Sequence, residues 1–205
     1  MGLRDILIGR HEVKGPAPDR LFAITTAYVG LQSEHEIDSL GSAAIVFQAL
    51  ATSEFEATLR DMEDVVRATG GDSATSVSTQ DDSYGYRWMI LRSPDGAPSV
   101  EDLAVGINAV STSIETAGHG ERLLCAVFAF LDANKNRIYF IYNYKRGFWY
   151  PFVPASDAAH PAAGEEAAAQ QRSTERELQI KAQMASELPM EPELERWFPL
   201  WGIPI

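Results

Sequence analysis

The chain has 205 residues, of which 45 % are hydrophobic and 22 % are charged, so it can bury a core without the help of disulfides or metals. Its formal net charge of −12 repels phosphate backbones, and we therefore expect no nucleic-acid partner. The single cysteine cannot form an internal disulfide, and no apolar run approaches the roughly 20 residues that cross a bilayer. These features predict a cytoplasmic protein, either free or peripheral to the inner face of the membrane.

The first residues, 1–20, are expected to form an N-terminal arm. Leu3, Ile6 and Leu7 fall near helical spacing, and arginines lie beside them. Two interpretations stay open for this arm. It is either a short helix that docks on the core or an amphipathic segment that contacts a membrane or a partner helix.

Residues 21–154 are expected to form one core domain that begins with strands. Residues 21–31 are rich in Phe, Ile, Thr, Tyr and Val, a composition that predicts a strand. Residues 33–42 are polar and are expected to form a loop. The apolar run at residues 43–50 then predicts a buried strand.

Two amphipathic helices are predicted within this core. In residues 52–68, apolar side chains recur at spacings of 4, 3 and 4, and Thr52 or Ser53 can cap the first turn. A second helix begins after Ser99, which stands three residues before Asp102 in a capping-box arrangement. Its apolar stripe is Val100, Leu103, Ile107, Val110 and Ile114.

The remaining core segments are predicted strands joined by short turns. Residues 123–131 are nearly all apolar, as expected for a central strand that is covered on both faces. The other predicted strands are residues 74–80, 84–92, 137–145 and 147–153. Strands in this order indicate an α+β fold, in which an antiparallel sheet of mixed hairpins packs against two or three helices.

The composition changes after the core. Residues 155–172 are rich in Ala, Pro and Glu and are expected to be a linker. Residues 173–205 are expected to rejoin the same domain as a C-terminal helix, capped by Thr174 with Glu177 and running to about residue 188, followed by an aromatic tail. The tail is expected to dock either on its own domain or on a partner.

No motif predicts a catalytic residue, a metal site or a cofactor, so the chain is not expected to be an enzyme. The turn at Asp132 resembles the start of a calcium loop, but Arg137 and Asn143 occupy the positions that need Gly and Glu. A hairpin turn explains the same residues. Cys125 lies inside an apolar run and is expected to be a buried structural cysteine.

Two segments, residues 142–152 and 197–201, are unusually rich in aromatic residues. In residues 142–152, aromatic side chains surround the basic pair Lys145 and Arg146, and three interpretations of this segment stay open. They are a protein interface, stacking on bases, and an ordinary core strand with a solvated turn. The candidate partner-binding residues of the two segments are Tyr144, Lys145, Arg146, Trp149, Trp197 and Trp201.

The alternative hypothesis is a small-molecule-binding or enzymatic domain. It predicts a cleft between the sheet and the helices with converging polar groups. Arg87, Tyr144 and His119 are the candidates to line that cleft.

Five stretches together resemble one known family. They are residues 1–10, 82–88, 123–128, 144–152 and 195–202. On these stretches the chain resembles the PspAB family, proteins associated with phage-shock protein A (PspA). The resemblance implies an accessory role in an envelope-stress response, with PspA or a related stress protein as the partner. It offers no catalytic residue to carry over.

Overall fold

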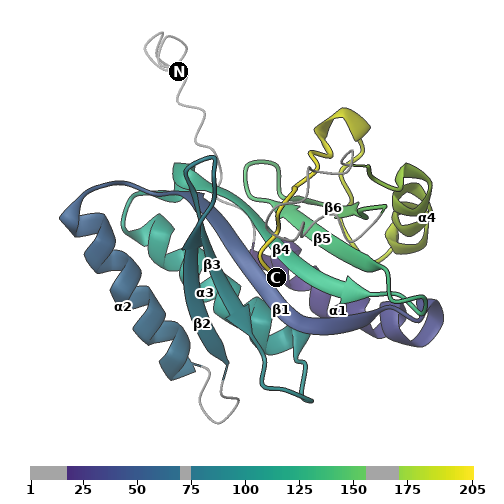
Figure 1. The fold of residues 1–205 in the computed structure, drawn as a ribbon, viewed down its shortest axis with the longest axis horizontal. Helices are drawn as coiled ribbons and strands as arrows, with labels where there is room; N and C mark the ends of the chain where they lie inside the picture. Colours follow the sequence, from purple (N-terminus) through teal and green to yellow (C-terminus); the bar gives the residue numbers. More distant parts are fainter. Residues whose placement is uncertain (1–17, 70–74, 156–170) are drawn as a thin grey trace, which may run out of the picture.

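The fold is built around one β-sheet, with helices on one side and the C-terminal segment on the other (Figure 1). The computed structural model describes residues 18–69, 75–155 and 171–205. Within them, six antiparallel strands lie in the order β2-β3-β1-β4-β5-β6. The strands are β1 (Asp38–Gln48), β2 (Ser76–Asp81), β3 (Tyr86–Arg92), β4 (Leu123–Leu131), β5 (Arg137–Asn143) and β6 (Phe148–Phe152). The helices are α1 (Pro18–His35), α2 (Ser53–Thr69), α3 (Val100–Thr116) and α4 (Thr174–Met184), and the predicted α+β class is confirmed.

One face of the sheet is covered by helices. Successive strand residues point to opposite faces, so alternate side chains of β1 and β4 meet α1, α2 and α3. The predicted apolar stripe of α3 is fully buried. The Ser99 hydroxyl accepts a 3.1 Å hydrogen bond from the Asp102 amide, so Ser99 caps the helix as predicted. Thr52 caps α2 through a 3.3 Å bond from the Phe55 amide. We call this side the helix-covered face.

The predicted strand at residues 21–31 is wrong, because this segment is the middle of α1. Its buried residues Leu21, Ile24, Ala27 and Leu31 recur every three or four positions, which is the period of a helix. The composition favours a strand, but the apolar spacing places one helical stripe against the sheet. The predicted loop at residues 33–42 is also wrong, since α1 continues to His35 and β1 begins at Asp38.

The C-terminal helix forms, but its predicted cap and end differ. It ends at Met184, and no side chain caps its first turn at Ser173. The Glu177 carboxylate instead accepts a 2.9 Å bond from the Val153 amide and pairs with Arg172 at 2.6 Å. Glu177 therefore ties α4 to the end of β6.

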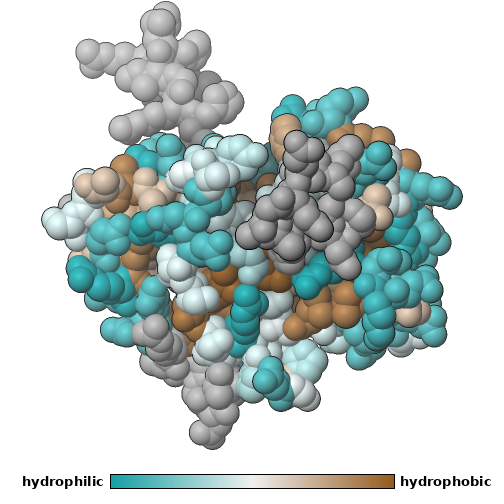
Figure 2. Space-filling view, viewed as in Figure 1, coloured by the Kyte–Doolittle hydropathy of each residue, from teal (hydrophilic) through white to brown (hydrophobic). Residues whose placement is uncertain are grey.

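The opposite face is crossed by the C-terminal tail, residues 197–205, drawn in yellow in Figure 1. Trp197, Ile203 and Ile205 are buried against the sheet. Arginines at three positions donate to tail carbonyls, which holds the tail across the strands. Figure 2 shows hydrophobic atoms gathered in the middle of this side of the molecule. We call it the tail-covered face.

Of the expected N-terminal arm, residues 1–20, residues 1–17 lie outside the described residues and residues 18–20 begin α1. Residues 156–170 of the expected linker also lie outside the described residues. Among the helices that the structure describes, none combines the length and the apolar character needed to cross a membrane.

Candidate functional site

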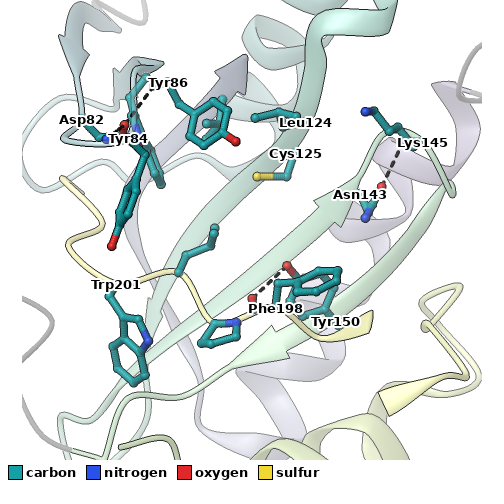
Figure 3. A pocket seen from close by; sticks show the side chains of 14 residues that line it. Asp82, Tyr84, Tyr86, Leu124, Cys125, Asn143, Lys145, Tyr150, Phe198 and Trp201 are labelled. Atoms are coloured by element: carbon teal, nitrogen blue, oxygen red, sulfur yellow. Dashed lines mark hydrogen bonds between the residues drawn. The ribbon is translucent and has the colours of Figure 1, made fainter. Parts of the chain in front are cut away.

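A pocket of about 390 Å³ opens on the tail-covered face (Figure 3). Its floor is a row of paired residues that runs across four strands. Trp88 pairs with Val46, Val46 with Cys125, and Cys125 with Asn143. The walls come from the turn between β2 and β3 on one side and from residues 198–201 of the tail on the other.

The first wall is built by Asp82. One of its carboxylate oxygens accepts 2.9 Å bonds from the amides of Tyr84 and Tyr86, and the other accepts a 3.0 Å bond from the indole of Trp88. Gly85 completes the turn with a φ of 81°, a conformation that favours glycine. The turn presents the Tyr84 side chain to solvent, where it is 76 % exposed.

The second wall is the tail. The Tyr150 hydroxyl donates a 3.1 Å bond to the Phe198 carbonyl, and the Trp201 ring meets Phe152 edge-on at a centroid distance of 5.0 Å. The Phe198 ring itself is 58 % exposed. Tyr84, Phe198 and, to a smaller extent, Tyr86 are the exposed aromatic side chains among the described residues, and all three line this pocket.

Cys125 lies in the floor. Its thiol is buried, as predicted, and this burial raises the pKa of the thiol to about 12. A thiol with such a pKa is protonated at neutral pH and is a poor nucleophile.

Lys145 lies at the end of the pocket opposite Asp82 in Figure 3. The turn that carries it is fixed by Asn143, whose side-chain oxygen accepts a 3.0 Å bond from the Lys145 amide. Within the described part of the chain, the Lys145 ammonium has neither an ion pair nor a hydrogen bond. It is exposed, and its charge is available to a ligand.

Several predicted partner-binding residues are in the core instead. Tyr144 and Trp149 are buried on the helix-covered face, and Trp197, at the start of the tail, is buried against the sheet, where its ring stacks on Tyr150. For Trp149 the reason is the alternation of strand residues, which places Trp149 of β6 on the helix-covered face and Tyr150 on the other. These three side chains are not presented to a partner in this structure.

Arg146 is also occupied within the chain. Its guanidinium pairs with the buried Glu191 at 2.6 Å and with Glu193 at 3.0 Å. Burial by itself would raise the pKa of Glu191, but Arg146 and the Glu193 amide together hold it below its ordinary value. Of the six predicted residues, Lys145 and Trp201 line the pocket.

The three residues expected to line the alternative cleft are engaged elsewhere in the structure. Arg87 pairs with Asp81 at 2.6 Å and with Glu56 at 2.8 Å, and the His119 ring packs against Phe55 at 5.2 Å. Tyr144 belongs to the core of the helix-covered face. The pocket of Figure 3 lies on the other face, against the tail.

The Asp132 turn is the hairpin that the sequence predicted. Both Asp132 carboxylate oxygens are used inside it, by the amides of Asn134 and Asn136 and by the Asn136 side chain. Within residues 18–69, 75–155 and 171–205, no three His, Cys, Asp or Glu side chains are grouped so that they could hold a metal ion.

Tyr84, Tyr86 and Phe198 are not among the partner-binding residues predicted from the sequence. The sequence feature that points to the first two as exposed residues is an aromatic pair in a turn, since Tyr84 and Tyr86 flank Gly85. Four of the five stretches on which the family resemblance depends contribute to the pocket: 82–88, 123–128, 144–152 and 195–202. The fifth, residues 1–10, lies outside the described residues.

Comparison with known proteins agrees with that resemblance. The model of the family described as "PspAB: PspA associated protein B" matches residues 1–205. Neither the curated proteins nor the solved structures include a match to the chain. Since the family model spans the chain from end to end, the chain belongs to the PspAB family, the PspA associated proteins B.

Proposed function

We propose that this protein is a non-catalytic adaptor of a PspA-type membrane-stress response, which binds PspA or a related stress protein through the pocket on the tail-covered face. The observation that carries the proposal is the gathering of Tyr84, Tyr86 and Phe198 at one pocket. The family name supports the identity of the partner.

Exposed aromatic side chains are costly to keep in water, and their gathering at one place is typical of a protein interface. Tyr and Trp are enriched among the residues that dominate binding energy, especially around a pocket that excludes water. Here Tyr84 and Tyr86 stand on one side of the opening and Phe198 on the other. A partner that spans the opening would cover all three rings.

The chemistry of the pocket supports binding more than catalysis. Among the described residues that line it there is no histidine to act as a general base. Asp82 uses one carboxylate oxygen within its own turn and the other on the Trp88 indole, and the raised pKa of the Cys125 thiol opposes thiolate formation. The remaining lining groups are largely aromatic or aliphatic, which favours contacts over reactions.

The test is a binding measurement with the PspA protein of the same organism by isothermal titration calorimetry. We expect wild-type protein to bind, and Tyr84→Ala and Phe198→Ala each to lower the affinity about tenfold or more. The matched control is Val29→Ala, which removes a 67 % exposed apolar side chain from α1, far from the pocket lining. Folded wild-type protein that does not bind, or a control that weakens binding equally, would contradict the proposal.

A second candidate function is the binding of a small molecule. It is supported by the pocket volume of about 390 Å³, which is within the usual range for ligand sites. A thermal-shift screen with small metabolites separates the two functions. Stabilisation by a metabolite of a protein that does not bind PspA would favour this second function.

A further inference from the structure

The pocket has a charged group at each end, and among the described residues only the ammonium lacks a hydrogen-bond partner. Both carboxylate oxygens of Asp82 accept hydrogen bonds from its own turn and from Trp88. The ammonium of Lys145 has no partner among the described residues. A ligand that fills the apolar middle therefore meets an unpaired positive charge at one end.

The shape of the rim indicates how large the ligand is. A small molecule enclosed by the pocket would cover the floor row of Trp88, Val46 and Cys125. It would leave most of Tyr84 in solvent, because this ring stands out from the turn and is 76 % exposed. Tyr84 and Phe198 are covered together only by a ligand that extends past the rim, as a polypeptide does.

We propose that the pocket takes one large apolar side chain, preferably aromatic, from a partner polypeptide, and that Lys145 pairs with a carboxylate beside that side chain. This inference rests on the proposed function and adds the chemistry of the partner segment. The net charge of −12 opposes a strongly acidic partner, so a single carboxylate next to the apolar anchor is the best match. Lys145 then contributes selectivity for the flanking charge rather than most of the affinity.

The four tryptophans of the chain supply internal reporters. Trp88 and Trp201 line the pocket, whereas Trp149 and Trp197 are buried elsewhere. In ¹H–¹⁵N spectra of the full chain, a ligand in the pocket is expected to shift the indole signals of the first pair and to leave those of the second pair in place.

The probes are short Gly/Ser peptides with blocked ends that carry two variable central residues. The pairs are Phe–Glu, Phe–Ser, Phe–Lys and Ala–Glu. We expect the Trp88 and Trp201 signals to shift most with Phe–Glu, less with Phe–Ser and Phe–Lys, and not at all with Ala–Glu. A further peptide that ends in Phe with a free carboxylate tests whether a chain terminus supplies the same anion as a Glu side chain.

Variants of Lys145 test the charge. Lys145→Glu is expected to abolish the preference for Phe–Glu over Phe–Lys and to lower the Phe–Glu affinity about tenfold, while Lys145→Arg retains the preference. Lys145 is exposed and carries no described ion pair, so neither change is expected to disturb the fold. Cys125→Met, which lengthens a floor side chain into the pocket, is expected to weaken every Phe peptide equally.

Three outcomes would overturn the inference: Phe–Lys binding as tightly as Phe–Glu, no shift of Trp88 and Trp201 at millimolar peptide, or a shift with decanoate but with no peptide. If PspA binds and the peptides do not, the inference fails and the proposed function survives. If the peptides bind and PspA does not, the pocket chemistry stands and the proposed function fails.

Discussion

The two faces of the sheet are covered in different ways. On the helix-covered face, α1, α2 and α3 place repeated apolar stripes over the strands and leave the core residues almost fully buried. On the tail-covered face, one extended segment, residues 197–205, crosses strands that are equally apolar. A helix presents a broad stripe, whereas an extended chain covers only a narrow band, so part of this second face stays open as the pocket. Stability and recognition are thus expected to depend on different faces.

The largest effect is expected from removing a core side chain on the helix-covered face. Phe128 is 1 % exposed, and its ring packs against Trp149 at 5.7 Å. Phe128→Ala leaves a cavity that the surrounding side chains cannot fill, and it is expected to lower the free energy of unfolding by about 3–5 kcal/mol. Urea denaturation followed by circular dichroism measures this. A loss smaller than about 1 kcal/mol would contradict the claim that this face carries the stability.

The next effect concerns Arg172, which joins the start of α4 to the tail. Arg172 pairs with the fully buried Glu177 and donates to the Trp197 carbonyl. Burial raises the pKa of Glu177 above its ordinary value of 4.5, although bonds from Arg172 and Val153 oppose the rise. A carboxyl whose pKa is raised in the folded state contributes stability below its unfolded pKa and loses it as the pH rises through the folded pKa.

Arg172→Gln removes the opposing charge, so the pKa of Glu177 rises further. We expect the variant to lose about 1–3 kcal/mol of unfolding free energy near pH 8 and clearly less near pH 5. Melting temperatures at the two pH values check this. Arg176→Gln is the matched control, since the half-buried Arg176 makes a solvent-exposed bond to Gln179 on the same helix. A loss in Arg172→Gln that is the same at both pH values would refute the role given to Glu177.

A smaller effect is expected within the tail. Trp201 is only half-buried, and its ring contacts Phe152 edge-on. Trp201→Ala is therefore expected to cost about 1 kcal/mol of stability, the usual range for such an aromatic pair. Because the ring also lines the pocket, PspA binding is expected to weaken more than stability does. Calorimetric binding and urea denaturation of the same variant separate the two losses.

The smallest effect on stability is expected at the rim. The Tyr84 side chain points into solvent from its turn, so Tyr84→Ala is expected to change the unfolding free energy by no more than about 0.5 kcal/mol. A clearly larger loss of unfolding free energy would contradict the claim that stability depends on the helix-covered face. Urea denaturation of this variant beside Phe128→Ala gives the direct comparison.

Local patterns were sufficient for several elements of the fold. The apolar spacing in α2 and α3 and the Ser99 cap predicted both helices, and the continuous apolar run predicted β4 as a strand covered on both faces. The composition of residues 21–31 predicts a strand, but the spacing of their apolar residues is that of a helix. In α1 an apolar residue at every third or fourth position gives the helix one side to bury against the sheet, and this outweighs the strand-like composition.

The pocket is a different case. Its lining comes from residue 46 and from residues within 82–88, 124–125, 143–150 and 198–201, which are far apart in the chain. Their proximity depends on the order of the strands and on the path of the tail, neither of which a local pattern specifies. Sequence analysis could select aromatic residues, but it could not tell buried rings such as Trp149 from rim rings such as Phe198.

The sequence by itself determined the family, the α+β class, the buried cysteine and the hairpin at Asp132, because each follows from residues that are close together or from a pattern spread along the whole chain. Only the tertiary structure decided which aromatic side chains are core and which are exposed, and that Arg146 is paired while the Lys145 ammonium has no partner among the described residues. The reason is physical: burial and ion pairing are properties of neighbours in space, and here those neighbours are brought together by the sheet and by the tail that crosses it.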